Sequence, residues 1–487
     1  MSSRAPIRRP PAATFPPEAL DAVDALIASM LPGGSEVAPA FMDIARRYAD
    51  ALIRGSDETE RSRVAAAVVV AHARMGDPAE AARLAESEIA VARAADRLDA
   101  DRLSLLLSAA AEAFLTPGNV RPGTASALQA LSYATLAAQD ELVFRAHTLL
   151  AVGYALNGQY EEAERSAAAC RQLQAAHHWE VSAVFYSLLL GEILIHSSTL
   201  DSGELRRITG ELRSAEPGNR LWTATADSAE AMALLAINDH ATAIPLLMGV
   251  LSDANSTGIL PMVRGFALGI QADLLLARGE ARRVLRVLQG RRSPWSHALC
   301  FDMQRSAAYL LLGENRDALL VTDACMKLGP DHCLRTVPPL LFRRAVAHLR
   351  LGQGARADEA FEEGFRLILQ SGSLTPLLTL APDEIRGLAQ RLGERRPELA
   401  LQVDDFVRQL TQLPVVDRVR SALPRLSPRE SVLASRLRTG DSLVSVAESL
   451  SVSHNTVKSQ ARTLYRKLGV TSRADALDAL EGAGFFD

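Results

Sequence analysis

The chain has 487 residues, with 53 Lys and Arg side chains against 57 Asp and Glu, a net charge of −4. This length allows several domains or one long repeat array, and the acidic balance excludes a chain that wraps nucleic acid along its whole length. The four cysteines, Cys170, Cys300, Cys325 and Cys333, form no Cys-x-x-Cys pair, so neither a disulfide framework nor a metal site is expected.

The N-terminal segment from Met1 to Pro17 contains three arginines and five prolines and lacks the apolar core of a signal peptide. Residues 1–16 are therefore expected to form a disordered leader. The longest apolar stretch, residues 181–195, contains Glu192 and is too short to span a bilayer. We expect no membrane segment and a cytoplasmic location.

Residues 17–413 are rich in Ala and Leu and poor in aromatic residues, which predicts helix almost throughout. Turn signals recur through this region at intervals of 34 to 42 residues, mostly about 40. They fall at Gly34, Gly76, Gly118, Gly158, Ser198, Asn238, Gly279, Gly313 and Gly352. Two helices in each period of about 40 residues predict a superhelical array of helical hairpins.

Several units resemble tetratricopeptide repeats in their central portion. Residues 155–164 and 74–82 each have a helix, a glycine turn at Gly158 or Gly76, and a second helix that carries alanines. The period exceeds the usual 34 residues, and most of the aromatic and proline positions of that repeat are absent. The array is thus predicted to be tetratricopeptide-like.

A nucleotide-hydrolysing module is not expected. No Gly-x-x-x-x-Gly-Lys-Ser/Thr occurs, and the only lysines are Lys327, Lys458 and Lys467, none of which is placed to contact phosphates in a P-loop. The chain also lacks a coherent set of acid, base and nucleophile, so it is predicted not to be an enzyme and to use no cofactor. By elimination, the array is the part that binds a regulatory partner or ligand.

Residues 414–424 are predicted to be a linker, and residues 425–487 a compact domain of four helices. Ser427, followed by Pro428 and Glu430, forms a capping box that begins a helix ending near Thr439, with Val432 on its apolar stripe. Two further helices are expected at 443–450 and 454–468, capped by Ser442 and Ser453, and a fourth runs from Ser472 to about residue 480.

The third of these helices has two distinct faces. Val457, Ala461, Leu464 and Leu468 fall on one narrow stripe, which predicts that this stripe packs on the preceding helices. The opposite face is basic, and no carboxylate occurs between residues 454 and 467. The pattern is typical of a helix-turn-helix, although a solvated charged face is the alternative interpretation.

Residues 424–487 resemble the LuxR-type DNA-binding domain of bacterial transcription regulators. The matching positions include Leu426-Ser427-Pro428-Arg429-Glu430, Val446-Ala447, Thr456-Val457-Lys458, Lys467-Leu468-Gly469-Val470 and Ser472-Arg473-Ala474. Large members of that family often place a superhelical array before this domain and an ATPase module before the array. The resemblance implies a regulator of this kind that lacks the ATPase module.

The resemblance also implies which side chains meet DNA, with residues 454–468 as the recognition helix in the major groove. Lys458, Ser459 and Arg462 are expected to face base edges, and Asn455, Thr456, Arg466 and Lys467 to lie against phosphates. Arg and Lys can donate to both acceptors of guanine in the major groove, so Lys458 and Arg462 are expected to carry most of the sequence specificity.

The family resemblance further places a dimer contact on the fourth helix, where Ala474, Leu477 and Leu480 share one side. The alternative is that these residues pack on the core of their own domain. The predicted function is sequence-specific transcription regulation by a homodimer on double-stranded DNA, with activation through RNA polymerase implied by the resemblance. The competing hypothesis is a helical-repeat scaffold whose C-terminal domain contacts only proteins.

Overall fold

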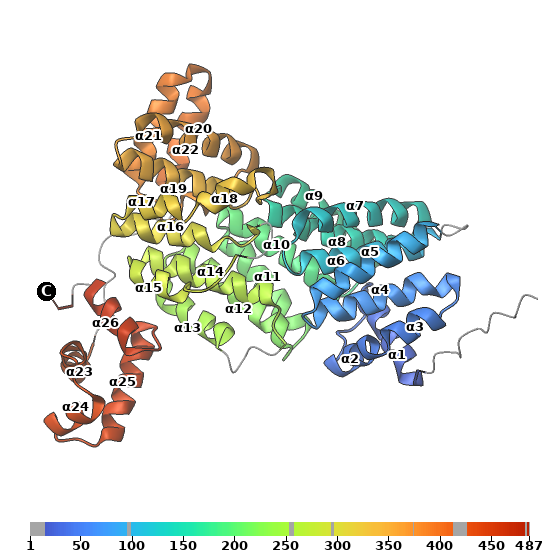
Figure 1. Ribbon diagram of the computed structural model, residues 1–487, viewed down its shortest axis with the longest axis horizontal. Helices are drawn as coiled ribbons and strands as arrows, with labels where there is room; N and C mark the ends of the chain where they lie inside the picture. Colours follow the sequence, from blue (N-terminus) through green and yellow to red (C-terminus); the bar gives the residue numbers. More distant parts are fainter. Residues whose placement is uncertain are drawn as a thin grey trace, which may run out of the picture. The chain divides into compact units, whose positions relative to one another are not determined.

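The computed structural model describes residues 15–94, 99–252, 258–293, 297–373, 375–412, 426–482 and 485–486 (Figure 1). Within these ranges the chain is helical and contains no strand, which confirms the predicted all-α class. The predicted linker and nearly all of the predicted leader lie outside the described residues. The chain divides into two compact units, residues 1–156 with 161–192, and residues 157–160 with 193–487.

The first unit is a series of helical hairpins. Its helices are α1 (Pro17–Ser29), α2 (Pro39–Arg47), α3 (Ala49–Gly55), α4 (Glu58–Arg74), α5 (Pro78–Ala94), α6 (Ala100–Leu115), α7 (Val120–Ala137), α8 (Asp140–Asn157) and α9 (Tyr160–His177). Helix α6 packs on α4, α5 and α7, and nearly all of its residues after Asp101 are buried. An apolar helix surrounded by neighbours on all sides is expected inside a stacked array.

Helix α10 (Phe185–Thr199) spans the boundary between the units, and the second unit continues the array. Its array helices are α11 (Ser202–Ala215), α12 (Arg220–Ala236), α13 (His240–Leu251), α14 (Pro261–Ala277), α15 (Ala281–Val287), α16 (Phe301–Leu312), α17 (Asn315–Leu320), α18 (Asp323–Leu328), α19 (Val337–Arg350), α20 (Gly354–Ser371), α21 (Pro382–Arg395) and α22 (Ala400–Gln412). Short 3₁₀ turns η3 (Gly329–Asp331), η4 (Thr375–Leu377) and η5 (Pro397–Leu399) join some of them. The C-terminal domain comprises α23 (Pro428–Arg438), α24 (Leu443–Ser449), α25 (His454–Leu468) and α26 (Arg473–Gly482).

Most of the predicted turn signals coincide with helix ends. Gly76 and Gly118 have φ angles of 83° and 87°, a backbone conformation that glycine adopts without a steric penalty. One signal is displaced: Ser198 is still inside α10, and the turn falls at Leu200, whose φ is 59°. A hydroxyl residue near a helix end therefore marks such a turn only to within a few residues.

The hairpin pattern is irregular from α15 to α18, in the shortest predicted interval, from Gly279 to Gly313, and in the one that follows it. Helices α15, α17 and α18 have only seven, six and six residues, against 12 to 18 in most of the others. Short helices bury less apolar surface, so this part of the array depends more on other contacts. No helix among the described residues is long and apolar enough to cross a membrane.

A buried ionic network joins three helices of the first unit. Glu112 of α6 accepts from Arg74 Nε of α4 at 2.7 Å and also pairs with Arg145 of α8, which is 1% exposed. Burial by itself raises the pKa of the Glu112 carboxyl, but the two guanidinium groups outweigh it and lower this pKa to about 2. The ionised carboxylate therefore holds the buried Arg145 and the partly buried Arg74 in place.

We predict that Glu112→Gln lowers the free energy of unfolding by about 3–5 kcal/mol, because it leaves both guanidinium groups without their anionic partner. The folded pKa lies below the ordinary value of 4.5, so the carboxylate's contribution is complete above about pH 4.5 and is lost as the pH falls towards 2. Urea unfolding followed by circular dichroism measures both effects.

The matched control is Asp50→Asn, since Asp50 pairs with Arg54 on the surface at side-chain exposures of 87% and 73%. Such a pair contributes about 0–1 kcal/mol. Equal urea midpoints for the two variants would contradict a stabilising role for the buried network.

Candidate nucleic-acid interface

The C-terminal domain begins with the capping box that the sequence predicts. Ser427 Oγ accepts from the backbone N–H of Glu430 at 3.4 Å, and Glu430 Oε2 accepts from the backbone N–H of Ser427 at 2.7 Å. These two bonds satisfy amides that have no partner within helix α23. The start of α23 at Pro428 is thereby confirmed.

The second and third helices of the domain are capped by serines as well. Ser442 Oγ accepts from Ser445 N–H at 3.1 Å at the start of α24, and Ser453 Oγ accepts from Thr456 N–H at 3.1 Å at the start of α25. Between them Ser451 has a φ of 51°, so the turn is tight. The caps and the turn together set the direction in which α25 leaves α24.

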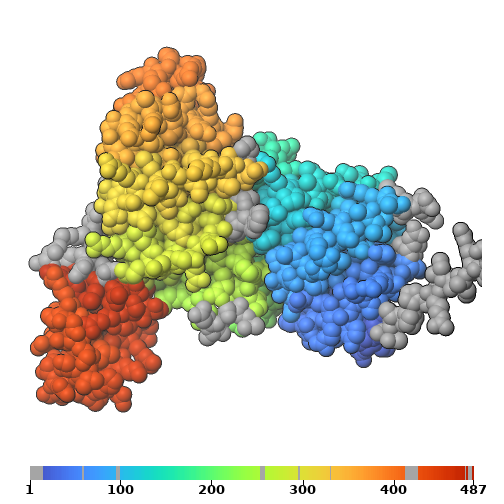
Figure 2. All heavy atoms as spheres, viewed as in Figure 1, coloured from blue at the N-terminus to red at the C-terminus, as the bar shows by residue number. Residues whose placement is uncertain are grey.

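One face of α25 is buried in the core of the domain. Its four stripe residues, Val457, Ala461, Leu464 and Leu468, are between 0% and 3% exposed. They pack with residues of the other three helices, which are Leu433, Ala434, Leu437, Val446, Ala447, Ala476, Ala479 and Leu480. The domain is the red body in Figure 2, and its own apolar core holds α25 in place.

The opposite face of α25 is exposed and carries only neutral or positive polar side chains. All seven predicted DNA contacts are exposed: Asn455, Thr456, Lys458, Ser459, Arg462, Arg466 and Lys467. Among the described residues, no ion pair engages Lys458, Arg462 or Arg466. Helix α25 therefore presents three positive groups from one rigid surface, which suits recognition of a nucleic acid backbone and of base edges.

Lys467, the seventh predicted DNA contact, is already paired within the domain. Its Nζ lies 2.7 Å from Oε2 of Glu430, the residue that closes the capping box of α23. The Lys467 ammonium, and after it the Ser427 backbone N–H, lowers the pKa of the Glu430 carboxyl. Lys467 thus ties α25 to α23, and a phosphate would have to compete with this carboxylate for it.

The three predicted dimer residues of α26 differ in exposure. Leu480 is fully buried in the core of its own domain, Leu477 is partly buried against that core, and Ala474 is exposed. The expectation that Leu480 contacts a partner chain needs correction, because its surface is already used inside the domain. Of the three residues, only Ala474 and Leu477 leave surface for a partner.

Two features of the domain were not predicted. Arg473 donates to the backbone carbonyl of Asp441 at 2.7 Å and to that of Leu437, so it joins the start of α26 to the end of α23. Val432, predicted on the apolar stripe of α23, is instead 43% exposed, and Leu433, Ala434 and Leu437 form the buried face.

Comparison with known proteins identifies a family for the C-terminal domain. A family model described as "Bacterial regulatory proteins, luxR family" matches residues 424–480. No curated protein sequence matches the chain. Among solved structures, a chain of the "Crystal structure of APC/C hetero-tetramer Cut9-Hcn1" is similar with 14% identity and a TM-score of 0.36, over 92% of this chain and 83% of that one.

Proposed function

We propose that this chain, whose C-terminal domain belongs to the luxR family of bacterial regulatory proteins, activates transcription from specific DNA sites in the bacterial cytoplasm. The observation that carries the proposal is the exposed, carboxylate-free face of α25, held in place by the buried stripe on its other side. A helix of this kind fits the major groove of double-stranded DNA.

In the proposed complex Lys458, Ser459 and Arg462 contact base edges. Lys458 and Arg462 lie about one turn apart on the exposed face, with Ser459 beside them, which matches the reach of a recognition helix into the groove. Asn455, Thr456 and Arg466 flank them and contact phosphates, and Lys467 adds a weaker phosphate contact because Glu430 neutralises part of its charge.

Replacing Arg462 and Arg466 separately tests these roles. Arg462→Ala is expected to lose about 1–3 kcal/mol of specific binding and to relax the preference at one base position, because a base contact is removed. Arg466→Ala is expected to weaken binding to all sequences alike and to lower the slope of log affinity against log salt by about one. Fluorescence anisotropy with a selected duplex and its single-base variants measures both. If Arg462→Ala binds with unchanged affinity and preference, the base-reading face is misassigned.

We further propose that two chains bind together on DNA through α26. The exposed Ala474 and the partly buried Leu477 lie one turn apart on that helix, and a symmetric contact through them would place two recognition helices on adjacent half-sites. The operator is then an inverted repeat with half-sites about one helical turn apart, and the bound dimer contacts RNA polymerase.

Ala474→Glu tests the dimer without touching the buried core. The longer charged side chain is expected to abolish cooperative binding to two half-sites, while binding to a single half-site changes no more than in the control. The control is Ser435→Glu, which makes the same charge change on the exposed side of α23. Equal cooperativity in the two variants, measured by gel shift on one-site and two-site duplexes, would place the dimer contact elsewhere.

The array also offers a pocket for a regulatory ligand, in the second unit between α10, α12, α14, α16 and α19. The cavity has a volume of about 70 Å³. On the same measure one water molecule needs roughly 10–15 Å³, so the cavity has room for more than a single water. Its lining combines apolar side chains such as Met232, Phe266 and Ile270 with a few polar ones. That combination is typical of small-molecule sites.

Two buried polar atoms of the pocket residues lack a hydrogen-bond partner among the described residues, Nε of Arg343 and Oε1 of Gln304. The other end of Arg343 is fixed, because Nη1 donates to Pro339 O at 2.9 Å and Nη2 to Thr379 Oγ1 at 3.0 Å. The pocket also contains Asp273, whose carboxyl pKa is raised to about 6 by burial although Arg343 acts to lower it. The Arg343 guanidinium suits a ligand carboxylate, which would compete with Asp273 for it. The proposed effector is therefore a small organic acid with an apolar body.

Octanoate is a suitable probe for this class of ligand. It is expected to raise the melting temperature of the full-length chain, because a ligand that binds only the folded state stabilises it. Gly269→Leu is expected to abolish the rise, since a larger side chain there fills the pocket without removing a charge. The control is Gly210→Leu, which makes the same substitution at an exposed position of α11, outside the pocket. A rise that persists in Gly269→Leu, or no rise in the unsubstituted chain, would contradict this ligand site.

A further inference from the structure

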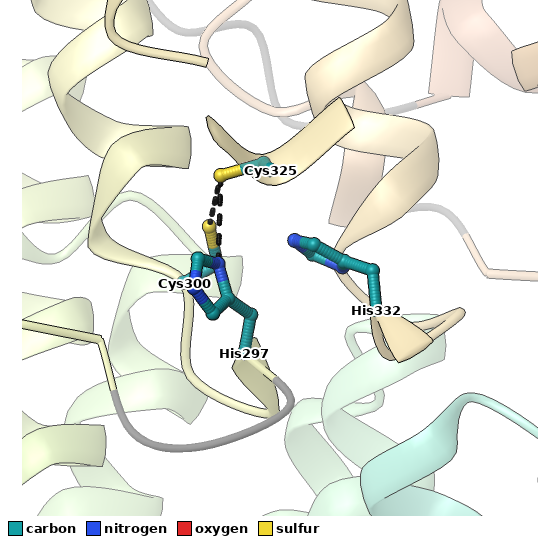
Figure 3. A group of neighbouring side chains, drawn as sticks. All are labelled: His297, Cys300, Cys325 and His332. Atoms are coloured by element: carbon teal, nitrogen blue, oxygen red, sulfur yellow. Dashed lines mark hydrogen bonds between the residues drawn. The ribbon is translucent and has the colours of Figure 1, made fainter. Parts of the chain in front are cut away.

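Four side chains that commonly bind metals meet in the second unit, far in sequence from the DNA-binding domain. They are His297, Cys300, Cys325 and His332, and one ligand atom from each lies within 4.8 Å of all the others (Figure 3). His297 and Cys300 come from the segment before α16, Cys325 from α18, and His332 follows the 3₁₀ turn η3. The cluster therefore joins three separate segments of the array.

Two distances within the cluster match those of a tetrahedral site, and all the others are at most 4.8 Å. The Sγ atoms of Cys300 and Cys325 are 3.7 Å apart, and Cys325 Sγ is 3.4 Å from His297 Nδ1. A tetrahedral zinc ion, with bonds of about 2.3 Å to sulfur and 2.0–2.1 Å to nitrogen, places two sulfurs about 3.7 Å apart and a sulfur and a nitrogen about 3.5 Å apart. Little movement is needed to close such a site.

His332 provides an independent indication of a ligand. The residue is 3% exposed, and its Nε2 is buried without a hydrogen-bond partner among the described residues. Its other ring nitrogen, Nδ1, lies 3.1 Å from the backbone oxygen of Cys333 and 3.3 Å from Thr336 Oγ1. Donation from Nδ1 to a carbonyl fixes the tautomer whose Nε2 carries a free lone pair, the arrangement usual for metal-binding histidines.

The backbone around His297 is held so that its ring faces the cluster. His297 has a φ of 54°, and its carbonyl accepts from Thr336 Oγ1 at 2.8 Å. Thr336 thus contacts both histidine segments. His297 and His332 also meet edge to face, with ring centroids 4.8 Å apart.

A disulfide between Cys300 and Cys325 is the main alternative use of this cluster. It would need the sulfurs to approach to about 2.05 Å. It would leave the two histidines without a role and His332 Nε2 still unsatisfied in the interior. A metal ion uses all four side chains and satisfies that nitrogen.

The position of the cluster in the fold indicates a structural role for a bound metal ion. Cys325 belongs to α18, which with α17 forms the pair of short helices where the hairpin repeat is interrupted. The apolar cluster at this point is small, comprising Cys300, Cys325 and Leu340 with Met303 and Met326 beside it. A metal ion that joins the segment before α16 to α18 and η3 would supply cohesion that so small a core lacks.

We infer that His297, Cys300, Cys325 and His332 form a closed structural site for one zinc ion in the array. Two thiolates and two neutral imidazoles are a ligand set that zinc favours, and four protein ligands leave no open position for catalysis. On binding, both thiols release their protons to solvent, so the dication and two thiolates leave the site neutral. The sequence pattern hides this site, because its ligands come as His-x-x-Cys and Cys-x₆-His rather than as Cys-x-x-Cys.

Cobalt titration of the full-length chain tests the site without any substitution. The reduced chain, stripped of metal with a chelator, is expected to bind one equivalent of Co²⁺, with the d–d bands of a tetrahedral ion and a sulfur-to-cobalt charge-transfer band. One equivalent of Zn²⁺ should abolish both signals. Failure to develop these bands under reducing conditions would overturn the proposal, as would an octahedral spectrum.

Substitutions then identify the ligands. Cys325→Ser and His332→Ala are each expected to reduce affinity for Co²⁺ at least tenfold and to alter the bands, with loss of charge-transfer intensity in Cys325→Ser. Cys170→Ser removes a buried thiol outside the cluster and is expected to leave the spectrum unchanged. If Cys170→Ser and Cys325→Ser give the same spectrum and affinity as the unsubstituted chain, the metal binds elsewhere and the inference is wrong.

Discussion

The contact on which the proposed function depends is the packing of one narrow stripe of α25 against the rest of its domain. Val457, Ala461, Leu464 and Leu468 are all buried, so the rotation of α25 about its axis is fixed by the hydrophobic effect. Lys458, Ser459 and Arg462 are exposed as a direct consequence. The serine caps at the starts of α24 and α25 and the Lys467–Glu430 ion pair reinforce the same geometry. A rigid recognition surface is what base reading requires, because a misplaced donor loses its hydrogen bond.

The array is held together by different means in its two units. In the first unit, Glu112 lies between Arg74 and Arg145 and adds an ionic network to a continuous apolar core. Removing any one of these three side chains is costly, because the charged groups that remain would lose their partner inside the protein. In the second unit the hairpins shorten around α17 and α18, and the cluster of two cysteines and two histidines lies at that point. Cys300 and Thr336 also line the ligand pocket, so a metal ion at the cluster would stiffen one wall of that pocket. Cys300 and Thr336 thus belong both to the region that a metal ion would stabilise and to the proposed ligand pocket.

Local signals were enough to predict the C-terminal domain from sequence. The capping box at Ser427 and the stripe beginning at Val457 act over four to eleven residues, and both are present as predicted. The exposure of Val432 and the burial of Leu480 were not predicted. Both depend on which helices pack against α23 and α26, and local sequence spacing does not encode this. The cluster of two cysteines and two histidines was not predicted for the same reason. Its first and last members, His297 and His332, are 35 residues apart, and the pairs meet only through tertiary packing. The hairpin array was predictable from its period, whereas its short helices were not.

The central claim is that the exposed face of α25 reads DNA sequence rather than only attracting phosphates. The most direct measurement is selection of bound duplexes from a random pool by the full-length chain at near-physiological salt. The account predicts enrichment of an inverted repeat whose half-sites lie about one helical turn apart. Binding that weakens steeply with salt but enriches no motif would contradict it, because purely electrostatic contacts carry no sequence information.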